Sequence, residues 1–310
     1  MLADAVNLLA KGLSRGLARW VALGLLMPAL AFCQQTGPGG AASPGGPQTY
    51  VDMTPAELIK RVPELKHLEF AQDQELLPLI LQRVGATVAD FFDNFSNTTC
   101  TEDVLSTVHN PHWGHEVRYD RRFNYIALVK PGADKTVLEE TRSDPKGQTA
   151  QLGGAITTIG FVALAAHFEP DFQRDSRFRY LGREPMKGQS TYVMVFAQRP
   201  EVARQTGRVV QGDRIAKVFV QGVAWIEPET FRILRLRTDL EQPELQIDLQ
   251  RESTDVRYSA VTFTQGNKTL WLPREVNVSG QWGNMSFHNL HHYSDYRLFL
   301  VQTEEKQKNP

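Results

Sequence analysis

The sequence of 310 residues contains only two cysteines, almost no net charge and no apolar run as long as a membrane-spanning helix. Two cysteines cannot build a disulfide scaffold or a four-thiolate zinc site. A spanning helix needs about 18 or more apolar residues in a row, so we expect no transmembrane span in the mature chain. The formal charge of −1 excludes nucleic-acid binding by bulk electrostatics. A hydrophobic content of 41% is instead typical of a globular protein.

Sequence signatures of catalysis are also missing. The chain has no Gly-x-Ser-x-Gly elbow, no His-Glu-x-x-His helix and no phosphate-binding Gly-rich loop followed by Lys-Ser/Thr. Cys100 lies two residues before Glu102, whose negative charge would raise the pKa of the thiol and make it less reactive. No alternation of strands and helices is visible, which excludes a doubly wound nucleotide-binding fold. We therefore expect a non-enzymatic protein without a cofactor.

The first 33 residues are predicted to be a secretory signal peptide. Three basic residues, Lys11, Arg15 and Arg19, precede a short apolar run, and small residues follow near Ala29 and Ala31. Residues 34–50 are rich in Gly and Pro and are predicted to be a flexible linker. We expect residues 51–303 to form one domain, 304–310 to be a charged tail, and the protein to be periplasmic or secreted.

Cys33 raises the alternative of a lipid anchor. Leu30-Ala31-Phe32-Cys33 resembles the box in which bacterial lipoproteins are acylated on cysteine, but Phe32 stands where that pattern has Gly or Ala. Cleavage after Ala31 or after Cys33 is the simpler interpretation.

One long helix is predicted between residues 77 and 95. Its apolar residues recur at spacings of three and four, which places them on one face. They are Leu77, Ile80, Leu81, Val84, Val88, Phe91, Phe92 and Phe95. An earlier, shorter helix is expected at Thr54-Pro55-Ala56-Glu57, where a capping Thr is followed by Pro and Glu.

The rest of the chain reads as a long series of strands separated by short turns, which indicates antiparallel pairing. The predicted strands are Glu116–Lys130, Thr191–Gln198, Arg214–Ile226, Thr230–Asp239, Glu244–Arg251, Asp255–Gln265, Leu270–Ser279 and Met285–Val301. The second and third are apolar on both faces, whereas antiparallel sheets usually alternate apolar and polar residues. This pattern favours a sheet that is covered on both sides or curved around a cavity.

The expected fold is α+β, with a curved antiparallel sheet (an unclosed β-barrel) wrapped on the long amphipathic helix. Apolar side chains of the helix and the sheet would then face each other across a cleft. The cleft candidates are Leu77, Val84, Val88, Phe91, Phe196, Phe219 and Trp225. The apolar stretch of residues 155–168 is predicted to be a second core helix or, alternatively, a mobile lid.

Four segments resemble the periplasmic lipoprotein-carrier (LolA/LolB-like) proteins. They are Gly222 to Arg235, Val261-Thr262-Phe263, Trp271-Leu272-Pro273-Arg274 and Tyr293 to Phe299. The resemblance implies an unclosed β-barrel with an apolar cleft for acyl chains. A closer resemblance, over nearly the whole mature chain, is to a family of exported proteins of acidobacterial type, which brings no established activity. Neither resemblance assigns a role to an individual residue.

Two groups of histidines could suggest a metal site: His109, His112 and His115, and His288, His291 and His292. The first group lies in a turn-rich loop. In the second group, strand alternation puts His288 and His292 on one face and His291 on the other. We therefore expect no metal site. The strip of Arg232, Arg235 and Arg237 is typical of a solvated strand edge, although it could hold an anionic head group.

The function expected from these features is binding of a lipid or a lipoprotein acyl group in the cell envelope. The alternative is an envelope regulatory or protein-interaction module on the same scaffold, with its groove filled by its own side chains. The corresponding partner is a hydrophobic or lipid ligand, or an envelope protein.

The predicted leader can be tested on protein isolated from its native host. Export should remove the first 31 or 33 residues, so the intact mass should be that of the shortened chain. A mass increase from acyl chains on Cys33 would favour the lipid anchor instead. A cytoplasmic protein that still begins at Met1 would contradict export.

Overall fold

The computed structural model describes residues 48–131, 136–147, 158–186, 188–204, 207–211, 214–264 and 267–299. The predicted signal peptide with Cys33, the predicted linker up to Pro47 and the predicted tail 304–310 lie outside these residues.

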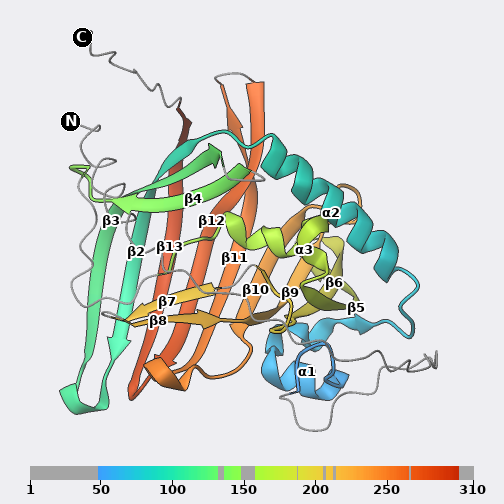
Figure 1. Ribbon diagram of the computed structural model, residues 1–310, viewed down its shortest axis with the longest axis horizontal. Coiled ribbons are helices and arrows are strands. Elements are labelled where there is room, and N and C mark those ends of the chain that lie inside the picture. The colour runs from blue at the N-terminus through green and yellow to red at the C-terminus, as the bar shows by residue number, and fades with distance from the viewer. Residues whose placement is uncertain are drawn as a thin grey trace, which may run out of the picture. The chain divides into compact units, whose positions relative to one another are not determined.

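Eleven strands of the described residues form one antiparallel sheet (Figure 1). In spatial order they are β1 (Glu69–Phe70), β5 (Ser176–Met186), β6 (Gln189–Gln198), β9 (Val220–Ile226), β10 (Ile233–Leu240), β11 (Leu249–Phe263), β12 (Lys268–Trp282), β13 (Met285–Leu298), β2 (Thr98–His109), β3 (Glu116–Pro131) and β4 (Thr136–Ser143). Within the described chain β1 and β4 are the two ends of this order and do not pair, so the sheet is not closed into a barrel. A separate two-stranded ribbon consists of β7 (Gly207–Gln211) and β8 (Arg214–Val218).

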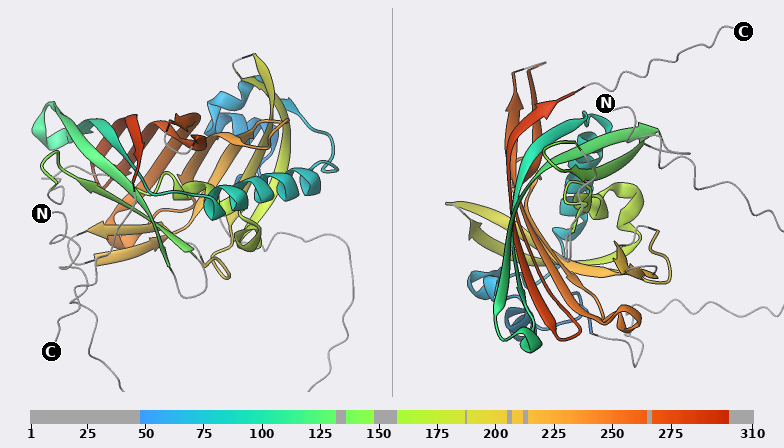
Figure 2. Two further views of the ribbon diagram at one scale, coloured as in Figure 1. Left: turned by 90° about the horizontal axis from the view of Figure 1, so that it is seen from above. Right: turned by 90° about the vertical axis from the view of Figure 1, so that its left-hand side faces the viewer.

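Helices cover the sheet from both sides (Figure 2). The long helix α2 (Leu77–Asp93) lies on what we term the inner face, together with the ribbon β7–β8. Helix α1 (Pro55–Arg61) lies on the opposite, outer face and continues into the 3-10 helix η1 (Pro63–His67). The capping box expected for the shorter helix is present, because Thr54 and Glu57 exchange side-chain and backbone hydrogen bonds. Pro78 lies in the first turn of α2, where a missing N–H costs no helical bond.

Strand alternation sends the apolar residues of β6 and β9 to both faces. On the inner face Met194, Phe196 and Ile226 pack against Ile80 and Val84 of α2. On the outer face Val193, Val195, Val223 and Trp225 pack against Leu58, Val62 and Leu65. Each large side chain fully buried in this way contributes roughly 1.5–3 kcal/mol of transfer free energy. Both helical layers are therefore required to cover a sheet that is apolar on its two sides.

The apolar stretch 155–168 departs from the predicted helix. Residues 158–168 contain a short 3-10 helix η3 (Ala163–Phe168), followed by α3 (Pro170–Gln173), and residues 155–157 lie outside the described chain. Gly160 has a φ of 100°, which interrupts helical geometry before η3. Phe161 and Phe168 are nevertheless buried against the inner face.

A buried ion pair joins two strands that are not neighbours in the sheet. Glu102 on β2 accepts hydrogen bonds from the Arg142 guanidinium on β4, through Nε and through Nη2 at 2.7 Å. His291 Nδ1 lies 2.9 Å from Glu102 Oε1, and the Tyr293 hydroxyl donates to the same oxygen at 2.6 Å. Burial alone would raise the pKa of Glu102, but the hydrogen bonds from Arg142 and His291 outweigh it and lower the pKa to about 2.

The same region holds the start of η3 against the sheet. Arg142 Nη2 donates to the Thr158 carbonyl at 2.7 Å. The Glu140 carboxylate accepts the backbone N–H groups of Val162 at 3.1 Å and Ala163 at 2.8 Å, together with the Tyr125 hydroxyl. Burial raises the pKa of Glu140. These contacts fix Val162 where it lines a pocket beside α2.

The ion pair gives a first structural prediction. Glu102→Gln should cost about 3–5 kcal/mol in the free energy of unfolding, because Arg142 would stay buried without a countercharge. Asp103→Asn is the matched control on the adjacent residue. Asp103 is 41% exposed and pairs with exposed Arg122, so its loss should cost about 0–1 kcal/mol. Urea unfolding measures both values. Equal costs for the two variants would contradict the structural role of Glu102.

The cost of Glu102→Gln in unfolding free energy should decrease as the pH falls. The pKa of Glu102 is about 2 in the folded chain and 4.5 as its ordinary value. Its stabilisation is therefore complete above about pH 4.5 and is lost as the pH falls from there toward 2. The stability difference between the wild type and Glu102→Gln should shrink over this window. A difference that stays constant from pH 7 to pH 3 would contradict the assignment.

Candidate functional site

A pocket of about 460 Å³ opens between the second half of α2 and strands β10, β11 and β12. Its apolar wall is formed by Val88 and Phe91 of α2, Val162 and Ala165 around η3, Ile233 of β10, Tyr258 of β11, and Leu270 and Trp271 of β12. Five elements, α2, η3, β10, β11 and β12, therefore converge on one apolar space.

The polar atoms of this wall have partners within the protein. The Trp271 indole Nε1 donates to the Ile233 carbonyl at 2.8 Å, and the Tyr258 hydroxyl donates to the Phe161 carbonyl at 3.0 Å. Burial also raises the pKa of Tyr258, which keeps its hydroxyl protonated. The wall thus presents mainly carbon, as small-molecule sites commonly do.

Polar residues surround the mouth of the pocket. Thr87 and Asp90 of α2 and its C-cap Asn94 lie on the helix side, and Thr230, Arg232, Lys268 and Thr269 come from the strand side. Thr87 Oγ1 donates to the Thr230 carbonyl at 3.2 Å, which ties the helix to the turn before β10. The Arg232 guanidinium lies over the Trp271 ring, 5.4 Å from its centroid. A mostly apolar pocket with a polar rim is suited to an amphiphilic ligand.

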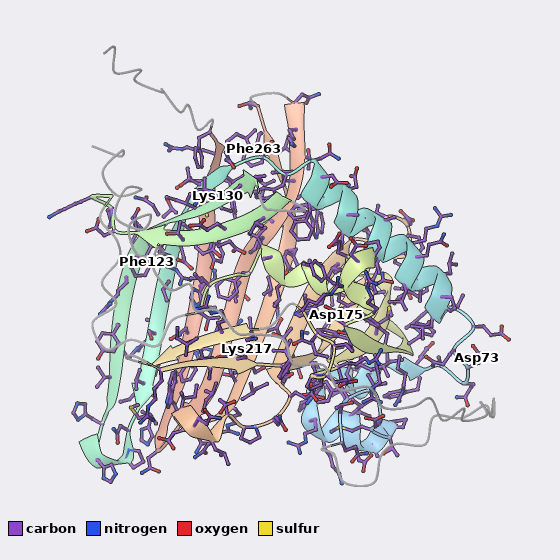
Figure 3. All side chains as sticks on the ribbon, viewed as in Figure 1. Asp73, Phe123, Lys130, Asp175, Lys217 and Phe263 are labelled. Atoms are coloured by element: carbon purple, nitrogen blue, oxygen red, sulfur yellow. The ribbon has the colours of Figure 1, made fainter. Side chains whose placement is uncertain are left out.

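The structure brings together only part of the cleft expected from the sequence. Val88 and Phe91 line the pocket. Val84 and Phe196 have no exposed surface and pack in the inner core, where Leu77 is partly buried. Figure 3 draws the described side chains on the ribbon and labels Asp175, which lies between α3 and β5. At Val84 and Phe196 the expected cleft is therefore solid core, and the pocket lies further along α2.

Trp225 and Phe219 are not where the sequence analysis placed them. Trp225 lies on the outer face against α1 and η1, with its Nε1 donating to Glu184 Oε2 at 2.6 Å. The predicted strand Arg214–Ile226 is broken at Phe219, which lies between β8 and β9 and belongs to none of the apolar clusters of the described residues. Both faces of β9 are apolar, so the sequence pattern could not tell which face turns toward α2.

Besides Val162 and Ala165, four wall residues on the strands were missed: Ile233, Tyr258, Leu270 and Trp271. A signal for two of them existed, because Ile233 and Trp271 belong to segments that resemble lipoprotein carriers. Their common position at one end of β10, β11 and β12 follows from strand pairing, for example Ala260 with Trp271 and Val261 with Leu270. Strand register is a tertiary property that single-sequence periodicity does not supply.

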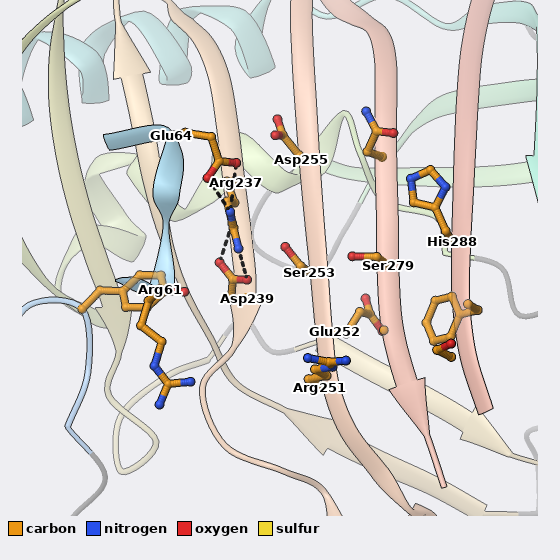
Figure 4. Close-up of a pocket in the computed structure, with 15 residues that line it drawn as sticks. Arg61, Glu64, Arg237, Asp239, Arg251, Glu252, Ser253, Asp255, Ser279 and His288 are labelled. Carbon is orange, nitrogen blue, oxygen red and sulfur yellow. Dashed lines mark hydrogen bonds and ion pairs between the residues drawn. The ribbon is translucent and has the colours of Figure 1, made fainter. Parts of the chain in front are cut away.

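A second pocket, of about 590 Å³, lies beside η1 and is polar (Figure 4). There Arg237 is bound between Glu64 and Asp239, with nitrogen–oxygen distances of 3.0 Å. Arg235 pairs with Asp255 and with Glu64. The side chains of these two arginines are only 13% and 15% exposed and are paired with carboxylates, so the predicted strip is not a solvated edge at Arg235 and Arg237. Arg232 is separated from them by a register shift between Ile233 and Arg235.

The second group of histidines lies on two opposite faces of β13, as strand alternation predicts. His288 and His292 are exposed, whereas His291 is fully buried and bound to Glu102. Burial lowers the pKa of His291, which keeps it neutral near pH 7. Among the described residues no group of three or more His, Cys, Asp or Glu side chains is arranged to hold a metal ion. Cys100 is buried, and burial raises the pKa of its thiol to about 12.

No helix in the described part of the chain is long and apolar enough to cross a membrane. No protein-family model matches the chain, and no curated protein matches it.

Several solved structures resemble the chain, and three of them are described here. A domain from Vibrio parahaemolyticus, described as an outer membrane lipoprotein-sorting protein, is 11% identical with a TM-score of 0.41, covering 73% of this chain and 94% of that chain. A DUF1329 family protein from Desulfovibrio piger is 11% identical with a TM-score of 0.39 and the same coverages. A LolA superfamily protein from Nitrosomonas europaea is 13% identical with a TM-score of 0.31, covering 72% and 94%. All three TM-scores lie below 0.5, so these neighbours carry no argument about the fold, ligand or partner of this chain.

Proposed function

We propose that the protein binds the acyl chain of a lipid or lipoprotein, without catalysis, in the pocket between α2 and β10–β12. The observation that carries this proposal is an apolar wall whose polar atoms are already bonded within the protein. The pocket volume of about 460 Å³ falls within the roughly 300–1,000 Å³ typical of small-molecule sites. An apolar chain entering it would displace water from carbon surface and leave no wall donor unsatisfied.

The side chains of the pocket support binding rather than chemistry. Its described lining contains no cysteine, histidine or serine, and the side chains of Asp90 and Lys268 are hydrogen-bonded to neighbouring residues at the rim. Tyr258 is held neutral and hydrogen-bonded, and the charged groups lie at the rim. The predicted leader further supports a site of action in the cell envelope.

A protein-interaction module is the second candidate. It is favoured by the solid packing of Val84 and Phe196, which closes the inner face next to the pocket. The two candidates differ in whether the pocket accepts an apolar ligand.

Binding of a fluorescent fatty acid should depend on the pocket and not on α2 in general. Phe91→Asp should weaken binding about tenfold or more, because it places an unpaired charge against the bound chain. Leu79→Asp is the matched control, since Leu79 lies on the same helix, is 43% exposed and does not line the pocket. Fluorescence titration gives the dissociation constants.

A second variant tests the same pocket without a buried charge. Ala86 is exposed at the pocket mouth, so Ala86→Trp should block entry while the fold is retained. Circular dichroism and urea midpoints confirm folding of each variant. Unchanged affinity in both pocket variants, or no binding by the wild type, would reject the carrier proposal and favour the interaction module.

A further inference from the structure

The charged residues at the pocket rim are not equally available to a ligand. Among the residues that line the pocket, the charged ones are Asp90, Arg232 and Lys268. Lys268 Nζ donates to Ser96 Oγ at 2.7 Å and to the Asn94 carbonyl. Asp90 Oδ1 accepts the Asn94 side-chain amide at 2.8 Å. The Arg232 side chain, in contrast, forms no hydrogen bond or ion pair with a described residue.

The surroundings of Arg232 nevertheless fix its position. The turn that carries it is closed by hydrogen bonds from Glu227 N to the Arg232 carbonyl and from Phe231 N to the Glu227 carbonyl, both 2.9 Å. The guanidinium lies over the Trp271 ring, and that indole is anchored to the Ile233 carbonyl. Stacking leaves the edges of a planar guanidinium free to bind a carboxylate or phosphate with two parallel hydrogen bonds.

Other arginines of this part of the sheet have carboxylate partners. Arg235 binds Asp255 and Glu64, and Arg237 binds Glu64 and Asp239. Two carboxylates, Glu227 and Glu229, lie on the same turn as Arg232. Neither forms an ion pair with it, and Glu227 accepts the Thr230 hydroxyl instead. Arg232 is thus a positioned but uncompensated cation next to an apolar pocket.

We propose that the ligand is an amphiphile with one anionic head group, carboxylate or phosphate, which pairs with Arg232 while its apolar tail occupies the pocket. This inference rests on the proposed function and names the class of ligand. The head group stays at the exposed rim, so it keeps part of its hydration, and the tail supplies the burial. The charge at Arg232 selects the head, and the apolar wall selects the tail.

The test compares a long-chain fatty acid with its methyl ester as competitors of a neutral fluorescent alkyl probe. The acid should bind about tenfold tighter than the ester at low ionic strength, since its carboxylate gains charge-assisted hydrogen bonds. Added salt should reduce this preference, because the site is exposed to screening. Acetate and inorganic phosphate without a tail should not displace the probe, which distinguishes an amphiphile from a free anion.

Variants assign the preference to Arg232. Arg232→Gln should bind acid and ester equally, with unchanged ester affinity, and Arg232→Lys should keep part of the preference. Arg274→Gln is the matched control, because Arg274 is exposed on β12 outside the pocket and should leave the preference intact. Equal binding of acid and ester by the wild type, or equal weakening of both by Arg232→Gln, would overturn this inference alone. Failure of acid, ester and probe to bind would overturn the proposed function as well.

Discussion

The two apolar faces of β6 and β9 impose the constraint on which the rest of the structure depends. An antiparallel sheet exposed on either of these faces would leave large apolar side chains in water, at roughly 1.5–3 kcal/mol for each. The chain meets this requirement with α2 on the inner face and with α1 and η1 on the outer face. Because both covers precede β5 in the sequence, the fold is held together by contacts between distant parts of the chain.

The pocket is a consequence of how α2 crosses the sheet. The first half of the helix packs tightly on β6 and β9, where Val84 and Phe196 exclude solvent. Its second half passes over the ends of β10, β11 and β12, where Val162 and Ala165 supply a further wall. Close packing at one end and an open space at the other allow one amphipathic helix both to stabilise the sheet and to border a binding site.

Buried charged residues some distance from the pocket hold the segment that forms one of its walls. Glu102 and Arg142 join β2 to β4, and Arg142 and Glu140 hold the backbone of residues 158–163. A buried pair of this kind adds little stability over an apolar core, but loss of one partner is costly. Its contribution here is positional, because Val162 then faces α2. Arg232 differs from these buried residues, because it has no ion-pair partner among the described residues and lies at the rim, where a ligand can reach it.

Local patterns in the sequence determined much of the secondary structure. The three-and-four spacing from Leu77 predicted α2, the Thr54–Glu57 pattern predicted the start of α1, and short turns predicted antiparallel pairing. The alternation of side chains along a strand was enough to predict that His291 lies on the opposite face from His288 and His292. Strand β2, which carries Glu102, was not predicted, because polar residues interrupt its apolar pattern.

Only the tertiary structure decided which apolar face of β9 meets α2, and so placed Trp225 outside the predicted cleft. It likewise decided the break at Phe219, the pairing of Glu102 with Arg142 and the meeting of Val88, Tyr258 and Trp271 in one pocket. Periodicity reports which residues share a face of one element. The register between strands and the path of a helix across them arise from packing among residues far apart in the chain, which no local pattern encodes.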